Sequence, residues 1–315
     1  MITIRKLLIT SLRLFATTGL LWALAARVDL SGAAKIMGQA YPPLLAATLL
    51  ALLSANVIVA LRWHVVLSAE ARSPGPGTLL KIVLVGLFFN QVLPTGVGGD
   101  AVRVWRCRKL GIGLGPAIRS VLLDRACGYL VLIVVYAATL PSLLQILPDA
   151  QQRGGVAALL GAGMLGLLAL LMLDCLPRPM LRVRVIARLA ELSPETRRLF
   201  TDPARCGAVL ALSALTMGLT ILAFKLVTEA VGSRLSLGSC IMIVPPVTLI
   251  QLLPVSLAGW GVREVVLVVA LAPFGVPPEA ALAISVLFGL CLVVIGLPGG
   301  LIWLVDWDIA RRPTK

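Results

Sequence analysis

The chain has 315 residues, 59% of them hydrophobic and only 13% charged, with a mean hydropathy of +1.00. A soluble protein of this composition would expose large apolar patches, and the longest polar stretch, 176–206, is too short to bury a core of its own, which excludes a soluble catalytic domain. The net charge of +14 is better explained by Lys and Arg in the cytoplasmic loops of a membrane protein than by binding of nucleic acid.

Apolar segments of about 20 residues, the length that crosses ~30 Å of hydrocarbon, recur along the chain. We expect spans over 7–26, 43–61, 120–140, 154–173, 207–227 and 279–304. The first has basic residues before it and resembles a signal peptide, but we interpret it as an uncleaved anchor because Arg13 interrupts the apolar run. The sequence therefore predicts one integral membrane domain over 1–315, an all-α polytopic bundle.

Two further apolar stretches are each interrupted by Pro and Gly. The first runs over 79–93, breaks, and continues in a short helix from Asp100 to Lys109. The second has arms over 239–253 and 262–274. Fifteen residues at ~1.5 Å each span only ~22 Å, less than a bilayer. We therefore predict two re-entrant broken-helix hairpins, 79–110 and 239–274.

The charge distribution predicts the orientation. With the N-terminus inside and each hairpin returning to its own side, twenty of the 28 Lys and Arg residues fall in inner segments and four in outer loops. Seven of the twenty lie in the loop between Arg178 and Arg205, which plain topology explains as well as binding of anionic lipid does. We expect both termini to be cytoplasmic.

The two interrupted stretches resemble each other in sequence. Residues 91–103 read QVLPTGVGGDAVR and 251–263 read QLLPVSLAGWGVR, sharing Gln-x-Leu-Pro and Gly-x-x-Val-Arg at equal spacing. Because three full spans separate the copies, the hairpins should enter from opposite sides. Inverted repeats of broken helices place a transporter's substrate site near the bilayer midplane, and broken helix ends suit a phosphate or carboxylate.

At these residues the chain resembles the flippase-like transmembrane family, also called the lysylphosphatidylglycerol synthase transmembrane region. The matching pieces cover nearly the whole chain: Arg62-Trp63, 88–94, Gly98-Gly99-Asp100 with Arg103, 123–125 and 254–264. The family includes the N-terminal half of a bacterial protein that makes and flips aminoacylated phosphatidylglycerol. No aminoacyl-transferase domain follows the last span here, so the resemblance implies the flipping half only. One departure is the Leu-Ala-Gly-Trp-Gly of 257–261, where a Gly-Gly pair like that of the first hairpin is expected.

Charged residues near the breaks are the candidate site. Asp100 and Arg103 can share one helix face. Either they contact a lipid headgroup, or Asp100 caps its helix and Arg103 marks the interface. Asp124 and Arg125 point about 100° apart and cannot face the same partner. Either they snorkel to the interface, or Asp124 pairs across the bundle with an arginine such as Arg103.

Arg263 and Glu264 carry the same hypothesis on the outer side, whereas Lys225 and Glu229 read as an ordinary i,i+4 pair. We also expect the hairpin residues nearest the breaks to contact substrate. These are Asn90, Pro94, Gly98, Gly99, Pro254 and Gly259.

Neither metal nor cofactor is predicted. The six cysteines form no CxxC pair, and His64 is the only histidine. We expect membrane lipids with anionic or aminoacylated headgroups as partners and no nucleic acid, and leave a homo-oligomer open.

Taken together, the sequence predicts a lipid flippase or headgroup transporter of the bacterial cytoplasmic membrane, moving a phospholipid, glycophospholipid or isoprenoid-type lipid between leaflets. We expect no enzymatic activity. Two alternatives stay open: a membrane-embedded enzyme acting on lipid-linked phosphate, and a non-transporting accessory subunit of an envelope-lipid pathway.

Overall fold

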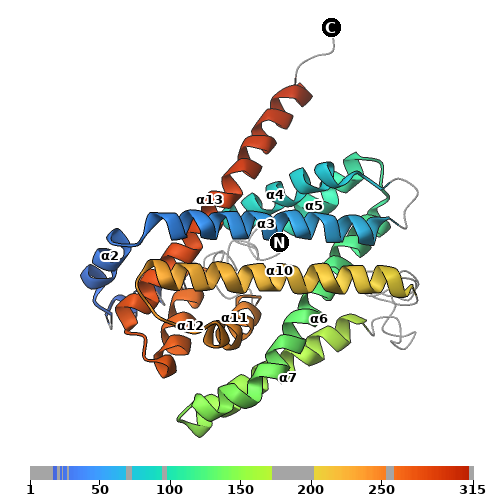
Figure 1. Cartoon of the computed structure of the whole chain (residues 1–315). Helices are drawn as coiled ribbons and strands as arrows, with labels where there is room; N and C mark the ends of the chain where they lie inside the picture. The colour runs from blue at the N-terminus through green and yellow to red at the C-terminus, as the bar shows by residue number, and fades with distance from the viewer. Residues whose placement is uncertain are drawn as a thin grey trace, which may run out of the picture.

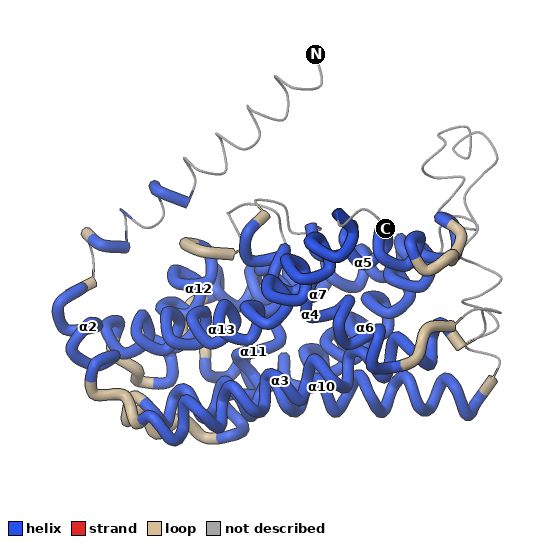
Figure 2. Tube along the Cα trace, turned by 90° about the horizontal axis from the view of Figure 1, so that it is seen from above, coloured by secondary structure: helices blue, strands red, loops and turns tan. Residues whose placement is uncertain are grey.

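The computed structural model describes residues 17–19, 22, 24–26, 28–68, 73–93, 98–171, 202–252 and 259–311. The described residues form helices joined by loops, with no strand among them (Figure 2). Most of the first predicted span, 7–26, and most of the basic loop lie outside these residues. The all-α prediction is confirmed.

Five of the described helices are long and apolar enough to cross a membrane. They are α3 (Pro42–Leu67), α6 (Leu114–Ile146), α7 (Ala150–Leu171), α10 (Pro203–Ala230) and α13 (Pro278–Arg311). Each contains or overlaps a predicted span and most are longer, because helices continue past the apolar core wherever neighbouring helices still pack against them. A short helix, α2 (Leu30–Gly38), precedes α3. The Asp29 carboxylate caps it by accepting from the Ser31 N–H, and the bonds that it accepts from Ser31 lower the pKa of Asp29.

Helices α3 and α10 pack side by side in opposite directions (Figure 1). The Tyr41 N–H at the start of α3 donates to the Ala230 carbonyl at the end of α10, at 2.8 Å. The first interrupted stretch forms α4 (Pro76–Val92) and α5 (Gly98–Lys109), and it begins shortly after α3 ends. The second forms α11 (Leu237–Gln251) and α12 (Val262–Leu271), followed by the 3-10 turn η2 (Ala272–Phe274), and it begins shortly after α10 ends. The two helix pairs therefore start at opposite ends of the α3–α10 pair.

Each helix pair is short and has its own apolar core. At the usual ~1.5 Å per residue, the 17 residues of α4 span ~25 Å and the 15 of α11 span ~22 Å. Side chains of α4, α5, α3 and α6 surround the fully buried Trp63. Side chains of α11, α12, α10 and α13 surround Ile243 and Leu267. The two helix pairs thus occur where the sequence predicts hairpins, while their re-entrant path through a membrane stays a prediction.

Helix α13 contacts both helix pairs through glycines. A Cβ atom added to Gly289 would collide with the Arg263 guanidinium of α12. A Cβ on Gly299 would collide with the Leu84 backbone of α4, and one on Gly300 with the Phe88 ring. Because lipid is as apolar as the helices, close approach through small residues is what holds such helices together. α13 therefore fixes the two helix pairs relative to one another.

Candidate functional site

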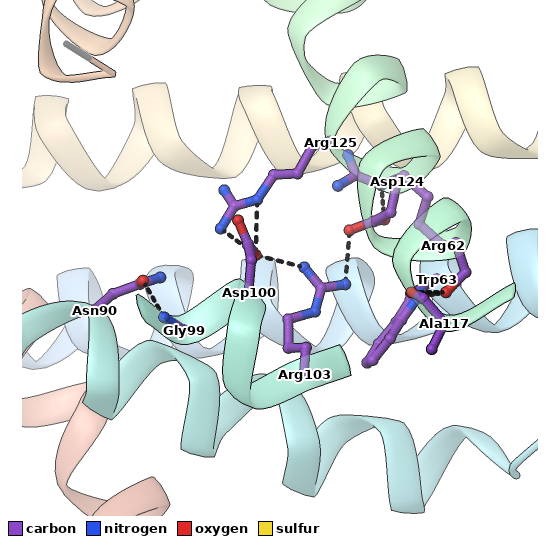
Figure 3. Close-up of polar contacts among 10 residues, drawn as sticks. Arg62, Trp63, Asn90, Gly99, Asp100, Arg103, Ala117, Asp124 and Arg125 are labelled. Carbon is purple, nitrogen blue, oxygen red and sulfur yellow. Dashed lines mark hydrogen bonds and ion pairs between the residues drawn. The ribbon is translucent and has the colours of Figure 1, made fainter. Parts of the chain in front are cut away.

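Five charged side chains from three helices meet inside the bundle (Figure 3). We call them the first charge cluster, which consists of Arg62 of α3, Asp100 and Arg103 of α5, and Asp124 and Arg125 of α6. Four of these were predicted site residues, and Arg62 was not.

Asp124 is the centre of the cluster. Its side chain is completely buried, and each carboxylate oxygen accepts from a different arginine. Arg62 Nε lies 2.8 Å from Oδ1, and Arg103 Nη2 lies 2.8 Å from Oδ2. The predicted pairing of Asp124 with Arg103 is therefore present, and the alternative of snorkelling to the interface is wrong. A buried charge needs such partners because the surrounding medium cannot solvate it.

Arg62 reaches Asp124 because two small residues leave it room. Its Nη1 donates to the Ser213 hydroxyl of α10 at 3.1 Å. A Cβ on Gly128, one turn after Asp124 on α6, would lie 3.0 Å from the same nitrogen. The predicted span ended at residue 61, and Arg62 and Trp63 were not among the candidate site residues. Since α3 continues to Leu67, both lie inside the bundle. The signal that could have identified them was the Arg-Trp pair among the residues of the family resemblance.

Arg103 is held on three sides. Its Nη1 lies 3.5 Å from Asp100 Oδ1, so the two residues share a face of α5 as predicted. Its guanidinium lies 4.0 Å from the centroid of the Trp63 ring, a cation–π contact. The Trp63 indole in turn donates to the Ser120 hydroxyl at 3.2 Å. The buried Nε of Arg103 has no hydrogen-bond partner among the described residues.

Arg125 completes the cluster on the opposite side of Asp100. Its Nη2 and Nε both donate to Asp100 Oδ1, at 3.0 and 3.2 Å. Asp124 and Arg125 therefore have different partners, as their ~100° separation on the helix requires. The Arg125 side chain is 34% exposed, the highest in the cluster. It is the cluster's most accessible cation.

The charges of the first cluster do not cancel. Three arginines face two aspartates, which leaves one positive charge. An unneutralised charge inside a bundle is costly, and it makes the site a good place for an anion.

The first hairpin places Asp100 and Arg103 through a close contact between α4 and α5. The Asn90 side-chain oxygen accepts from the Gly99 N–H at 2.8 Å, which caps the start of α5. A Cβ on Gly99 would collide with the Gly86 backbone carbonyl of α4 and would lie 2.6 Å from that oxygen, so only glycine fits. Gly98 and Gly99 are buried, and Pro94 lies outside the described residues.

A second, smaller cluster lies at the start of α12. Arg263 Nη2 donates to Glu264 Oε1 at 2.7 Å, the same oxygen accepts from the Ser285 hydroxyl of α13, and Oε2 accepts from the Gly261 N–H. The Arg263 guanidinium lies 4.5 Å from the centroid of the Trp260 ring. Of the alternatives left open for these residues, pairing across the bundle is wrong here, because the arginine pairs with its own neighbour in the first turn of α12. This pair is neutral.

The turn before α12 depends on glycine in an unusual backbone conformation. Gly259 and Gly261 have φ values of 84° and 86°, which side chains rarely adopt, and Trp260 lies between them. The expected Gly-Gly pair is thus replaced by two glycines flanking the aromatic that covers Arg263. Pro254 lies outside the described residues.

Two hollows adjoin these elements. An apolar groove of about 360 Å³ lies between α6, α7 and α11, lined by Tyr129, Ile133, Leu159, Ala162, Gly163, Gly166, Leu167, Leu249 and Leu252. A basic cleft of about 300 Å³ lies between α4, α5 and α13, lined by Thr78, Lys81, Ile82, Trp105, Arg106, Lys109, Leu110, Trp303 and Asp306. Cations and tryptophans together are typical of the headgroup level of a membrane.

The fold and the site define a class, the polytopic helical membrane proteins with a charge cluster buried in the bundle. The sequence family described as the lysylphosphatidylglycerol synthase TM region matches residues 6–300. The chain belongs to this family, as the sequence resemblance predicted. A search of curated proteins found no match.

Proposed function

We propose that this protein moves a lipid headgroup between the leaflets of a bilayer. The observation that carries the proposal is the single excess positive charge of the first charge cluster, inside a bundle of apolar helices. An anionic phosphate would neutralise that charge, whereas a zwitterionic headgroup would do so only in part. The family supports a lipid-related role.

The geometry suggests how a headgroup would be held. Arg125 is the exposed cation, and its guanidinium can exchange the Asp100 carboxylate for a phosphate oxygen. Asp100 would then be free to accept from the ammonium group of an aminoacylated headgroup. Arg62, Arg103 and Asp124 keep their own contacts during this exchange and hold the site together.

The two hairpins support transport between opposite sides. They start at opposite ends of α3 and α10, and the second arm of each contains a buried arginine that contacts a tryptophan ring. An amide side chain from the first arm also lies near the matching glycine in each: Asn90 bonds to Gly99, and Gln251 Oε1 would be 3.7 Å from a Cβ on Gly259. These parallels favour an inverted repeat, the architecture of many transporters.

The distribution of basic residues favours a bacterial cytoplasmic membrane with both termini inside. Arg62 and Arg103 were counted among the inner residues although they are buried in the cluster, but leaving them out does not change the direction of the bias. We propose transport without chemistry on the lipid.

The proposal is tested by reconstituting the protein in liposomes with tail-labelled phosphatidylglycerol, lysyl-phosphatidylglycerol or phosphatidylcholine and following the label's appearance in the opposite leaflet. Arg125→Gln should abolish protein-dependent movement of anionic lipid, and Arg125→Lys should restore part of it. Glu229→Gln removes an ordinary pair, Lys225–Glu229 at 2.7 Å, and serves as control. Transport by folded Arg125→Gln at the wild-type rate would refute the role. A covalent change of the lipid in mass spectra would favour an enzyme. If the protein moves none of the three lipids, an accessory subunit is favoured.

A further inference from the structure

One face of α6 changes from charged to apolar over about two helical turns, from Arg125 to Ile133. Arg125, Tyr129 and Ile133 are four residues apart, so their side chains lie above one another on the helix. Tyr129 lies next to Arg125 on this face and also lines the apolar groove, as does Ile133. The exposed cation of the first charge cluster therefore stands at the end of that groove.

The groove itself is almost wholly apolar. Besides Tyr129, it is lined by aliphatic side chains and by the glycines of α7. Leu249 and Leu252, at the end of α11, close it on the side of the second hairpin. Its volume of about 360 Å³ falls within the usual range for ligand sites, about 300–1,000 Å³.

We infer that this groove between α6, α7 and α11 takes one acyl chain of the lipid whose phosphate binds Arg125. The inference rests on the proposed function for the headgroup, and it adds that the chain enters the protein instead of staying in the bilayer. The charge next to the groove indicates which ligand it binds. An apolar groove beside the excess positive charge at Arg125 fits an amphiphile with an anionic headgroup and a hydrocarbon tail. The phenol of Tyr129 would lie at the junction, where its polar tip and apolar ring suit both parts.

Helix α7 offers a matched pair of variants. A Cβ on Gly166 meets nothing within 4 Å, and Gly166 lines the groove, so Gly166→Leu should fill the groove without disturbing the backbone. A Cβ on Gly161 also meets nothing within 4 Å, but Gly161 does not line the groove. Gly161→Leu therefore adds the same side chain to the same helix as a control.

The test is native mass spectrometry of the full chain with phosphatidylglycerol, which reads lipid binding directly. Gly166→Leu should weaken retention of the diacyl lipid by about tenfold, while Gly161→Leu stays at the wild-type level. Equal retention by folded Gly166→Leu would overturn the inference. If Gly166→Leu fails to fold, Ala162→Phe fills the same groove, with the exposed Leu165→Phe as its control.

The outcomes separate this inference from the proposed function. If the protein moves no lipid but Gly166→Leu still loses retention, the groove binds an acyl chain and only transport fails. If the protein moves lipid and Gly166→Leu moves it at the wild-type rate with full retention, transport stands and the acyl groove is refuted.

Discussion

Replacing Asp124 with Asn should be the most damaging single change in the bundle. The substitution keeps the side chain's size but removes the carboxylate that accepts from both Arg62 and Arg103 at 2.8 Å. Among the described residues, Arg103 would keep only Asp100 at 3.5 Å as a charged partner and Arg62 would keep none, and the Asn amide oxygen could replace only one of the two lost acceptors. Breaking a buried ion pair by removing one partner costs about 3–5 kcal/mol, because the remaining charge stays buried. We expect a loss of that size in the free energy of unfolding.

The assay is equilibrium unfolding in bicelles by steric trapping, which measures the free energy of unfolding directly. Glu229→Gln breaks an ion pair whose carboxylate is 43% exposed, and it should cost no more than about 0.5 kcal/mol. Adding Arg103→Gln to Asp124→Asn removes one of the stranded charges, so the double variant should recover about 0.5–3 kcal/mol relative to additive losses. If Asp124→Asn unfolds within ~0.5 kcal/mol of the wild type, the cluster does not stabilise the bundle and our reasoning fails.

Three further substitutions test the close contacts. Gly99→Ala should destabilise the first hairpin by about 1–3 kcal/mol, because its Cβ would lie 2.6 Å from the Asn90 side-chain oxygen; thermal unfolding in detergent measures this. Gly128→Leu should displace Arg62, whose Nη1 would lie 3.0 Å from the new Cβ, and lower both the melting temperature and lipid movement. Glu264→Gln should cost about 3–5 kcal/mol in the steric-trapping assay, because its neighbouring arginine is buried and contacts no other carboxylate among the described residues.

One control variant separates these effects from general damage to the helices. Gly154→Ala places a methyl group where nothing lies within 4 Å, so it should melt with the wild type. A Gly99→Ala variant as stable as Gly154→Ala would contradict the close contact between α4 and α5. If Gly128→Leu melts and moves lipid like the wild type, Arg62 has more room than the structure gives it. If Glu264→Gln has the same free energy of unfolding as the wild type, Arg263 is solvated.

The helical spans and the interrupted stretches could be predicted from hydropathy and from Pro and Gly alone. A bilayer imposes a length on every span, and breaks in an apolar run are visible as residues that do not continue a helix. The ends were less accurate: α6 begins at Leu114 and ends at Ile146, well beyond the predicted 120–140. Polar residues at those ends are compatible with a helix that packs against its neighbours, so hydropathy does not mark where it stops.

Pairing in the charge clusters was only partly predictable. The ~100° between Asp124 and Arg125 predicted separate partners, and the structure has them. Arg62 was missed because an arginine near the end of an apolar run is usually at the interface, and only the helix end at Leu67 shows otherwise. Ser213 and Ser285 were missed for a simpler reason: a lone serine in a span has no pattern, and its role depends on which helix lies opposite.

The two hairpins differ in the property that matters most for an anion, the net charge around the buried arginine. The first arginine, Arg103, belongs to a cluster with one excess positive charge, whereas the second, Arg263, is neutralised by Glu264. The same anion that neutralises the first cluster would give the second cluster an excess negative charge if it bound there. The two hairpins therefore cannot be equivalent binding sites for one headgroup: in the proposed transport the first binds it, and the second can bind it only if the Arg263–Glu264 ion pair separates.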